Sequence, residues 1–559
     1  MQRNIETLKG REFDIIVVGG GIYGACCAWD ATLRGLSVAV IEKNDFGSAT
    51  SSNSLKIIHG GLRYLQHADF KRMRESITER KNLMRIAPHL VSLLPCIMPT
   101  YGHGIKGKEV MSVALAINDL VGFDRNGLPD PEKHMPRGRV ISRDECLRIV
   151  PGVEANRLTG GAVWYDCQVR NSERLLLSFL RAAANAGAVP ANYVEMTGFR
   201  MEKNRVTGVH ARDNINGQDF DIHGRLVINS SGPWLNAILT NLNGHAPKKK
   251  YKMSAAMNLV VRKKLFPKFA VGISSKAEFR DSDAVIKKGS RLFFITPWRE
   301  YSLIGTTHVQ YDGDAHDFRI SEEDIQTFIL DINAAYPPAR VTRNDVCFFY
   351  GGLLPEDESP ADDGNVRLLK SYKIIDHQKD SGLEGLLSVV SVKYTTARDV
   401  AENTVDCALA KLGRKHVASR TSRVPVFGGE IENVSNYLNK EKARAFAGLS
   451  RDSIEHLVMN YGSKYPQVVT YISEQEEWRQ PLSSEHPVLA AEVIHAVREE
   501  MALKLSDVVR RRTELGSAGH PGNAALRQCA KLMSEELGWD ADQIENEIAE
   551  TEAIYVPRS

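Results

Sequence analysis

The segment FDIIVVGGGIYGACCAWDATLRGLSVAVIE, residues 13–42, decides the fold of this chain. The run at 13–18 is largely apolar and β-branched, which predicts a strand. A helical stretch follows the glycines and stops at Gly35, and SVAVIE at 37–42 predicts a second strand. These residues therefore predict a complete β-α-β unit.

The glycines of this unit have the spacing G-x-G-x-x-G at Gly19, Gly21 and Gly24. Gly19 suits a tight turn, Gly21 lets a pyrophosphate approach the helix N-terminus, and Gly24 allows close helix packing. Glu42 ends the second strand, where its carboxylate can accept hydrogen bonds from ribose hydroxyls. A glycine-rich structural turn is the alternative. We predict dinucleotide binding, with contacts from Gly19, Gly21, Ile22, Tyr23, Gly24 and Glu42.

Length and composition exclude several classes of protein. The chain has 559 residues, too many for one hydrophobic core. It carries 72 Lys and Arg against 69 Asp and Glu, a net charge of +3, so nucleic acid is not expected as a partner. None of the eight cysteines lies at metal-ligand spacing, so we predict reduced thiols and no metal site. The strand at residue 13 leaves no room for a signal peptide, and no apolar run approaches the ~20 residues that span a bilayer. We therefore expect a cytoplasmic protein.

Further elements are spread along the chain. We predict a helix at 174–187, a strand at 189–199, and strand-turn-helix segments at 225–239 and 386–413. Residues 255–263, 291–298 and 301–311 predict an antiparallel sheet, one face of which could cover a ligand. After about residue 430 the sequence is charged and almost wholly helical, which predicts a separate domain.

The residues after Glu42 distinguish FAD from NAD as the dinucleotide. An NAD fold would normally continue with a helix and a strand, whereas residues 48–70 read SATSSNSLKIIHGGLRYLQHADF. This segment resembles the FAD-dependent glycerol-3-phosphate dehydrogenases, within the wider D-amino-acid-oxidase-like flavoproteins. The resemblance extends to NSSGPW at 229–234, IGTTHVQYDGD at 304–314, VKYTTARDVAE at 392–402 and AVREEMALKLSDVVRRRTELG at 496–516. It covers nearly the whole chain.

The resemblance implies an α/β fold of three parts. These are a Rossmann-like FAD-binding domain, an antiparallel-sheet substrate domain and a C-terminal all-helical domain. The expected boundaries are 1–95, 155–245 and 365–420 for the FAD-binding domain, 96–154 and 246–364 for the substrate domain, and 421–559 for the helical domain.

The resemblance also implies further cofactor contacts. They are Thr50, Ser51, Ser52, Ser54, Lys56, His59 and Gly60 after the first unit, Val194 at the adenine, Ser231, Gly232 and Trp234 at a strand end, and Lys393 and Thr395 near the flavin. Thr395 precedes a helix whose N-terminus would stabilise negative charge on the reduced flavin. The alternatives are a Ser-rich surface turn for the first group and an ordinary helix cap for Thr395.

On the substrate side the resemblance brings forward Arg63, Tyr64 and Lys393, because fixed cations suit a phosphorylated polyol. Each of them could instead serve a structural ion pair, and His308 is either a general base or a structural histidine. The chain also departs from the family. It reads Ala255-Ala256-Met257-Asn258 for Lys-Gly-Ser-His, Tyr350-Gly351-Gly352-Leu353-Leu354-Pro355 for Tyr-Ser-Gly-x-Arg-Pro, and Ser391-Val392-Lys393 for Gly-Gly-Lys. We therefore predict an altered substrate, a larger phosphorylated or nucleotide-linked polyol.

The implied reaction moves a hydride from a secondary alcohol to flavin N5 and passes the electrons to a quinone, oxygen or a protein. An amine or amino-acid oxidase and a non-catalytic flavin-bearing partner protein are the alternatives. Basic residues at 71–85 and an amphipathic stretch at 111–123 leave peripheral contact with the inner face of a membrane open, although such features more often form a solvated face and a core helix. A homodimer is also left open.

Overall fold

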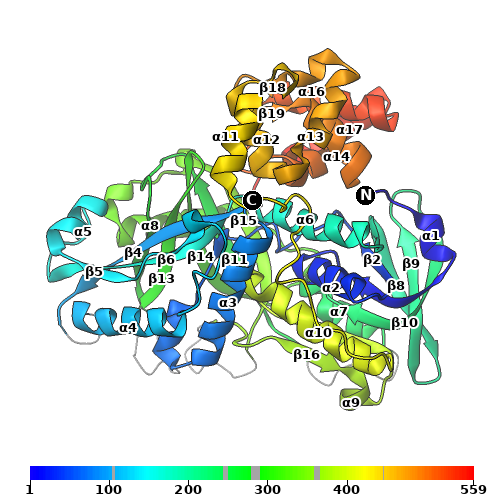
Figure 1. Cartoon of the computed structure of the whole chain (residues 1–559), viewed down its shortest axis with the longest axis horizontal. Helices are drawn as coiled ribbons and strands as arrows, with labels where there is room; N and C mark the ends of the chain where they lie inside the picture. Colours follow the sequence, from blue (N-terminus) through cyan, green and yellow to red (C-terminus); the bar gives the residue numbers. More distant parts are fainter. Residues whose placement is uncertain (104–106, 243–249, 279–289, 358–365, 445, 559) are drawn as a thin grey trace.

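The computed structural model describes residues 1–103, 107–242, 250–278, 290–357, 366–444 and 446–558. Two large sheets lie next to each other, and the C-terminal helices pack above the region where they meet (Figure 1). No helix in these ranges combines the length and the apolar character needed to cross a membrane.

The first sheet is built around the predicted β-α-β unit. Its strands are β1 (Glu12–Val18), β2 (Val38–Glu42), β7 (Val189–Asn192), β8 (Val194–Glu202), β9 (Arg205–Asp213), β10 (Asp219–Asn229), β16 (Lys373–Asp376) and β17 (Leu386–Val390). β1 pairs in parallel with β2 and β10, β2 with β7, and β10 with β17. Because helices cover the sheet, its central strands are apolar on both faces.

Three helices cover one face of this sheet. α2 (Ile22–Leu33) packs against both α6 (Ser172–Asn185) and α10 (Ala397–Lys411). Trp29 of α2 meets Phe179 of α6 edge to face, with 5.3 Å between ring centroids. This packing fixes α2, and with it the glycine turn at its N-terminus. The other short or peripheral helices are α1 (Ile5–Lys9), α3 (Phe70–Ile86), α7 (Leu235–Thr240) and α9 (His377–Ser381).

The second sheet is mainly antiparallel, as predicted. Its strands in the described residues are β3 (Ile57–Ile58), β4 (Val91–Tyr101), β5 (Arg139–Ile141), β6 (Leu158–Val169), β11 (Met253–Val261), β12 (Ala270–Glu278), β13 (Ser290–Trp298), β14 (Tyr301–Tyr311) and β15 (Val346–Pro355). One pair, β12 with β4, is parallel. The helices α4 (Lys108–Val121), α5 (Arg143–Ile149) and α8 (Glu322–Ala335) pack against this sheet.

The C-terminal domain has its own apolar core. Its helices are α11 (Val434–Arg444), α12 (Arg451–Tyr461), α13 (Tyr465–Val469), α14 (Ala490–Glu500), α15 (Leu505–Asp507), α16 (Asn523–Leu537) and α17 (Ala541–Ala553). A short hairpin of β18 (Pro481–Ser483) and β19 (His486–Leu489) interrupts them, so the domain is helical but not all-helical.

The predicted fold class is confirmed, with three differences in detail. The strand predicted at 189–199 is two strands, β7 and β8, because Tyr193 between them adopts a left-handed conformation with φ 55°. β6 falls within 155–245, which we expected in the FAD-binding domain, yet it pairs with β4 in the second sheet. β3 likewise pairs with β6 although it lies within 1–95. Strand pairing over such distances along the chain leaves no local signal.

Candidate active site

A cavity of about 1080 Å³ lies between the two sheets. The turn after β1, the end of β2 and the turns after β10 and β17 form one wall, at the carboxyl ends of the parallel strands. Strands β11 to β15 of the second sheet contribute the opposite wall. Open α/β sheets generally bind ligands at this edge.

The glycine turn forms a cradle at one end of the cavity. Gly19 has φ 103°, and a Cβ there would lie 2.6 Å from the Ser230 carbonyl oxygen, so only glycine fits. A Cβ at Gly24 would lie 1.9 Å from the Gly19 carbonyl oxygen, as expected of a packing glycine. Gly19, Gly21, Ile22 and Tyr23 line the cavity, whereas Gly24 lies behind them. The N-terminus of α2 therefore opens towards a ligand.

Glu42 lies beside this cradle at the end of β2. Its carboxylate accepts hydrogen bonds from the backbone N–H of Gly20 at 2.8 Å and of Asn44 at 3.0 Å. Burial raises the pKa of the Glu42 carboxyl above its ordinary value, and the two N–H donors act in the opposite direction. The side chain also lines the cavity, where a ribose can reach it.

The segment after Glu42 reaches the cavity with most of its predicted residues. Thr50, Ser51, Ser54, Lys56 and His59 line it. The other two do not. The Ser52 hydroxyl donates to the Gly47 carbonyl at 2.8 Å, and the Gly60 N–H donates to Asp166 at 2.7 Å.

The ammonium group of Lys56 is committed to a buried ion pair. Its Nζ lies 2.8 Å from Glu173 Oε2 and 3.1 Å from Ser172 Oγ. Nothing in the local sequence connects Lys56 with Glu173, because α6 brings the carboxylate in from another part of the chain.

The turn after β10 lies next to the glycine cradle, and Val194, Ser231, Gly232 and Trp234 line the cavity. Ser231 Oγ and Trp234 Nε1 are buried and have no hydrogen-bond partner among the described residues. Buried polar atoms of this kind mark a place for a polar ligand. Together with the glycine cradle, these two unpartnered atoms suit the polar groups of a flavin dinucleotide.

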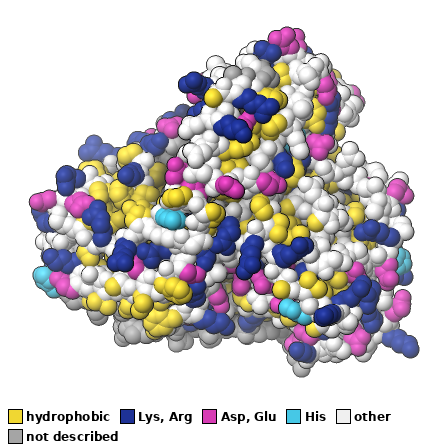
Figure 2. All heavy atoms as spheres, viewed as in Figure 1, with side chains coloured by type: hydrophobic (Ala, Val, Ile, Leu, Met, Phe, Trp, Pro, Cys, Tyr) yellow, Lys and Arg dark blue, Asp and Glu magenta, His cyan; other side chains and the backbone are white. Residues whose placement is uncertain are grey.

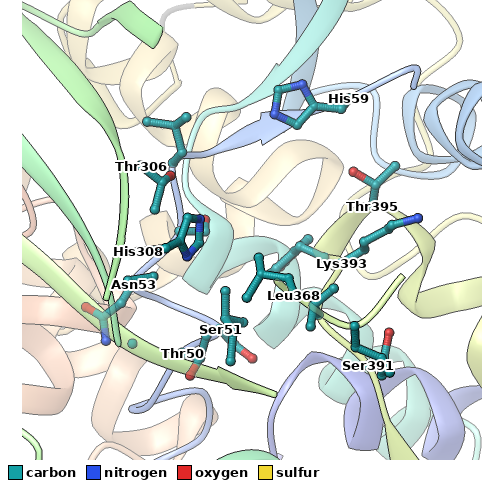
Figure 3. Close-up of a pocket in the computed structure, with 18 of the residues that line it drawn as sticks. Thr50, Ser51, Asn53, His59, Thr306, His308, Leu368, Ser391, Lys393 and Thr395 are labelled. Carbon is teal, nitrogen blue, oxygen red and sulfur yellow. The ribbon is translucent and has the colours of Figure 1, made fainter. Parts of the chain in front are cut away.

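The turn after β17 brings Lys393 and Thr395 to the cavity (Figure 3). The Tyr23 hydroxyl lies 2.7 Å from both Ser391 Oγ and the Lys393 carbonyl oxygen, which fixes this turn against α2. α10 begins at Ala397, so Thr395 precedes a helix as expected, and the side chain of Thr396 makes no cap hydrogen bond. Thr395, in the turn that leads into α10, therefore lines the same cavity as the glycine cradle.

Arg63, Tyr64 and Lys393 all line the cavity. Lys393 Nζ lies 4.3 Å from the centroid of the Tyr64 ring. Within the described part of the chain, neither Lys393 nor Arg63 forms an ion pair with a carboxylate, although the charge of Lys393 contributes to lowering the pKa of Asp69. The described residues therefore do not show the structural ion pairs that were the alternative role for Arg63 and Lys393.

His59 has a carboxylate behind it. His59 Nδ1 lies 3.3 Å from Asp166 Oδ2, while Arg80 and the Gly60 N–H donate to Asp166 Oδ1. Burial alone would raise the pKa of Asp166, but His59, Arg80 and Gly60 lower it to about 2. Asp166 is therefore ionised at neutral pH. No motif in the sequence indicates this pairing, because Asp166 lies on β6 outside all of the motifs.

The second sheet supplies Thr306 and His308 from β14. Both were within the quoted segment at 304–314, but only His308 was singled out. Three of the residues that depart from the family, Asn258, Leu354 and Val392, line the cavity. Asn258 also forms hydrogen bonds with Asn53 and Thr306. In the described residues no group of three or more His, Cys, Asp or Glu side chains could hold a metal ion.

Fold and site together define a class of protein. A β-α-β unit with a glycine cradle, a strand-end carboxylate and a large cavity closed by a second sheet belongs to a dinucleotide-binding enzyme architecture.

The chain belongs to the glycerol-3-phosphate dehydrogenase family of FAD-dependent oxidoreductases. Residues 14–374 match the FAD-dependent oxidoreductase family, and residues 419–544 match the C-terminal domain of alpha-glycerophosphate oxidase. The glycerol-3-phosphate dehydrogenase of Synechocystis sp. is 33% identical over 98% of this chain and 97% of its own length. The mitochondrial glycerol-3-phosphate dehydrogenase of Homo sapiens is 31% identical over 95% of this chain and 71% of its own length.

A solved structure agrees with these sequence relatives. The glycerol-3-phosphate dehydrogenase from Bacillus halodurans complexed with FAD is 25% identical, with a TM-score of 0.75 over 99% of this chain and 96% of that one. The predicted family and its FAD cofactor are therefore confirmed. The role of each individual residue at the site stays a prediction.

Proposed function

We propose that this protein oxidises the secondary alcohol of glycerol-3-phosphate to a ketone, with FAD as its cofactor. One observation carries the proposal. A single cavity holds a histidine backed by an ionised carboxylate together with two cations, Arg63 and Lys393, that lack carboxylate partners among the described residues. Similarity to glycerol-3-phosphate dehydrogenases over nearly the whole chain supports the same substrate class.

The two cations bind the phosphate. A phosphate dianion needs fixed positive donors, and arginine adds a planar fork that matches its oxygens. Tyr64 stacks under the Lys393 ammonium and fixes its direction. The substrate is thereby oriented with its phosphate towards the turn after β17.

His59 takes the proton of the secondary hydroxyl. Its Nδ1 faces Asp166, which leaves Nε2 as the basic nitrogen and stabilises the imidazolium that forms. FAD, when bound, supplies the hydride acceptor for the adjacent C–H bond. The N-terminus of α10 stabilises negative charge that develops in the cavity. The sequence predicts His59 as a cofactor contact and leaves His308 open as a general base or a structural histidine. The Asp166 contact favours His59 as the base.

The replacements at Asn258 and Leu354 led us to expect a larger substrate. The comparisons do not support that expectation, because the full-length relatives are named for glycerol-3-phosphate itself. They favour an alcohol dehydrogenase over an amine or amino-acid oxidase for the same reason. We therefore propose glycerol-3-phosphate, with a larger phosphorylated polyol as the competing substrate in the test.

The test is anaerobic reduction of the bound flavin in a stopped-flow spectrometer. Glycerol-3-phosphate should bleach the flavin at roughly 1 to 1,000 per second, and glycerol without phosphate should not at the same concentration. Bleaching by a larger phosphorylated polyol but not by glycerol-3-phosphate would contradict the proposed substrate. Oxygen consumption under air then separates oxygen from a quinone or protein as the acceptor.

We also propose contact with an anionic lipid surface through α4. Val113, Leu120 and Phe123 on or just after this helix are 60%, 74% and 79% exposed, and Arg74 of α3 lies over the Phe123 ring at 5.2 Å. Figure 2 shows hydrophobic side chains grouped on this face, with Lys and Arg side chains close to them. Apolar side chains beside cations suit a membrane interface. The homodimer stays a prediction.

Flotation with anionic vesicles tests this contact. The protein should float with them, and the pair Leu120→Ser and Phe123→Ser should stay at the bottom of the gradient. Leu330→Ser is a matched control, because Leu330 on α8 is 70% exposed in another part of the surface. Equal flotation of all variants would overturn the lipid contact.

A further inference from the structure

Thr306 occupies an irregular position in β14. In the pairing with β11, Met257 faces Thr307 and Asn258 faces Gly305, so Thr306 is the extra residue of a β-bulge. Bulges commonly redirect a side chain at a binding site. Here the bulge brings the Thr306 side chain to the cavity, on the side opposite Lys393 and Thr395 (Figure 3).

The Thr306 hydroxyl is already committed as a donor. It donates to Asn258 Oδ1 at 2.7 Å. The amide of Asn258 is oriented by its other end, because Nδ2 donates to the Asn53 carbonyl at 3.4 Å. Asn258 is 3% exposed, and a Cβ at Gly305 would lie 1.9 Å from its Oδ1, so the amide is closely confined.

This arrangement fixes what Thr306 can offer a ligand. A hydroxyl has one proton and two lone pairs, so a donating Thr306 presents only an acceptor to the cavity. An acceptor attracts a hydroxyl group and disfavours a carboxylate or phosphate oxygen, which has no proton to give.

We propose that Thr306, held by Asn258, selects the terminal hydroxyl of the polyol and so sets the direction in which the substrate binds. The inference rests on the proposed function. Phosphate binds at Lys393 and Arg63, the terminal hydroxyl donates to Thr306 on the opposite side, and the secondary alcohol lies between them at His59. Asn258 is the positioning residue of this pair.

The test compares glycerol-3-phosphate with propane-1,2-diol 1-phosphate, which keeps the phosphate and the secondary alcohol but lacks the terminal hydroxyl. Wild-type protein should prefer glycerol-3-phosphate by about tenfold in kcat/KM, since its acceptor is left unpaired by the deoxy compound. Thr306→Val should bring this ratio close to one, mainly through KM for glycerol-3-phosphate. Thr306→Ser should keep the ratio. Thr307→Val is the matched control, because Thr307 does not line the cavity.

Asn258→Leu supplies a second, gain-of-binding measurement. Without the Asn258 oxygen, Thr306 is free to donate, so 3-phosphoglycerate, with a carboxylate at that end, should inhibit at several-fold lower concentration than in wild type. Asn258→Asp keeps an acceptor for Thr306 and should not show this gain.

The outcomes separate the two proposals. If glycerol-3-phosphate reduces the flavin but Thr306→Val keeps the wild-type ratio, or Asn258→Leu gains no affinity for 3-phosphoglycerate, the role of Thr306 is overturned and the proposed function stands. If glycerol-3-phosphate does not reduce the flavin of the wild-type protein, both are overturned.

Discussion

His59 and Asp166 are 107 residues apart in the chain, yet His59 Nδ1 lies 3.3 Å from Asp166 Oδ2 at the wall of the cavity. The antiparallel pairing of β3 with β6 brings them together, because Ile58 faces Cys167 in the register. The strand pairing thus places a carboxylate behind the imidazole.

This pair predicts how activity depends on pH. His59→Asn should lower kcat by about 10²- to 10⁴-fold, the usual contribution of a general base, while FAD binding is retained. Asp166 has a pKa of about 2, below its ordinary value, so it stays ionised above pH 4 and contributes no limb to the profile there. Asp166→Asn should also lower kcat, because the imidazolium that forms during the reaction loses its anionic partner.

The control for this pair is His103→Asn, since the His103 side chain is 82% exposed. It should behave as wild type. An unchanged kcat in folded Asp166→Asn protein would show that Asp166 does not support a base at His59.

Replacement of Lys393 should weaken substrate binding. Lys393→Met should lower kcat/KM for glycerol-3-phosphate by about 10- to 100-fold, because a charge-assisted hydrogen bond to the phosphate is lost. Arg63→Gln should act in the same direction. Lys379→Met is the matched control, because the Lys379 side chain is 86% exposed on α9. Steady-state kinetics that show no change for Lys393→Met would place the phosphate elsewhere.

Replacement of Glu42 should lower the affinity for FAD. Glu42→Gln should weaken FAD binding by about 10- to 100-fold, since the ribose loses a charged acceptor and the new amide group faces a backbone N–H. Burial raises the pKa of Glu42, so this carboxylate takes up a proton at a higher pH than an ordinary glutamate does. FAD affinity should fall as the carboxylate becomes protonated. Titration of apoprotein with FAD between pH 4 and 7 should show this fall in wild type and a flat response in Glu42→Gln. Equal affinity at neutral pH would remove Glu42 from the ribose site.

Arg512 connects the C-terminal domain to the first sheet, and its replacement should lower the stability of the protein. Its guanidinium donates to both oxygens of the fully buried Asp45, which lies three residues after Glu42. Arg512→Met should lower the free energy of unfolding by about 1.5–3 kcal/mol, because Asp45 loses these charge-assisted hydrogen bonds but keeps the one from Arg511. The exposed pair Arg527–Glu545 is the comparison, and Arg527→Met should change stability little. A urea titration that shows equal loss for both would contradict the prediction.

Much of the first sheet could be predicted because its signals are local. The strand at 13–18, the glycine turn and Glu42 lie within one segment, and their order along the chain is also their order in space. Gly19 illustrates the reason, since its turn depends on neighbouring backbone atoms. The helix start at Ala397 was predictable for the same reason.

Other parts of the site had no such signal. Lys56 is predicted as a cofactor contact from its own segment, whereas the partner of its ammonium group, Glu173 at 2.8 Å, lies far outside that segment. Asn258 appeared only as a departure from the family, whereas the bulge in β14 makes it the acceptor for Thr306. Such pairings depend on where distant strands and helices meet, and composition and spacing do not record this.

The sequence by itself determined the β-α-β unit, the dinucleotide and the family, because each depends on contiguous residues whose backbone chemistry is local. Only the tertiary structure decided which charges remain available to a ligand. Lys56 is neutralised by Glu173, while Lys393 and Arg63 have no carboxylate partner in the described residues. The physical reason is that a charge acts through its nearest neighbours in space, and these come from elements more than a hundred residues away.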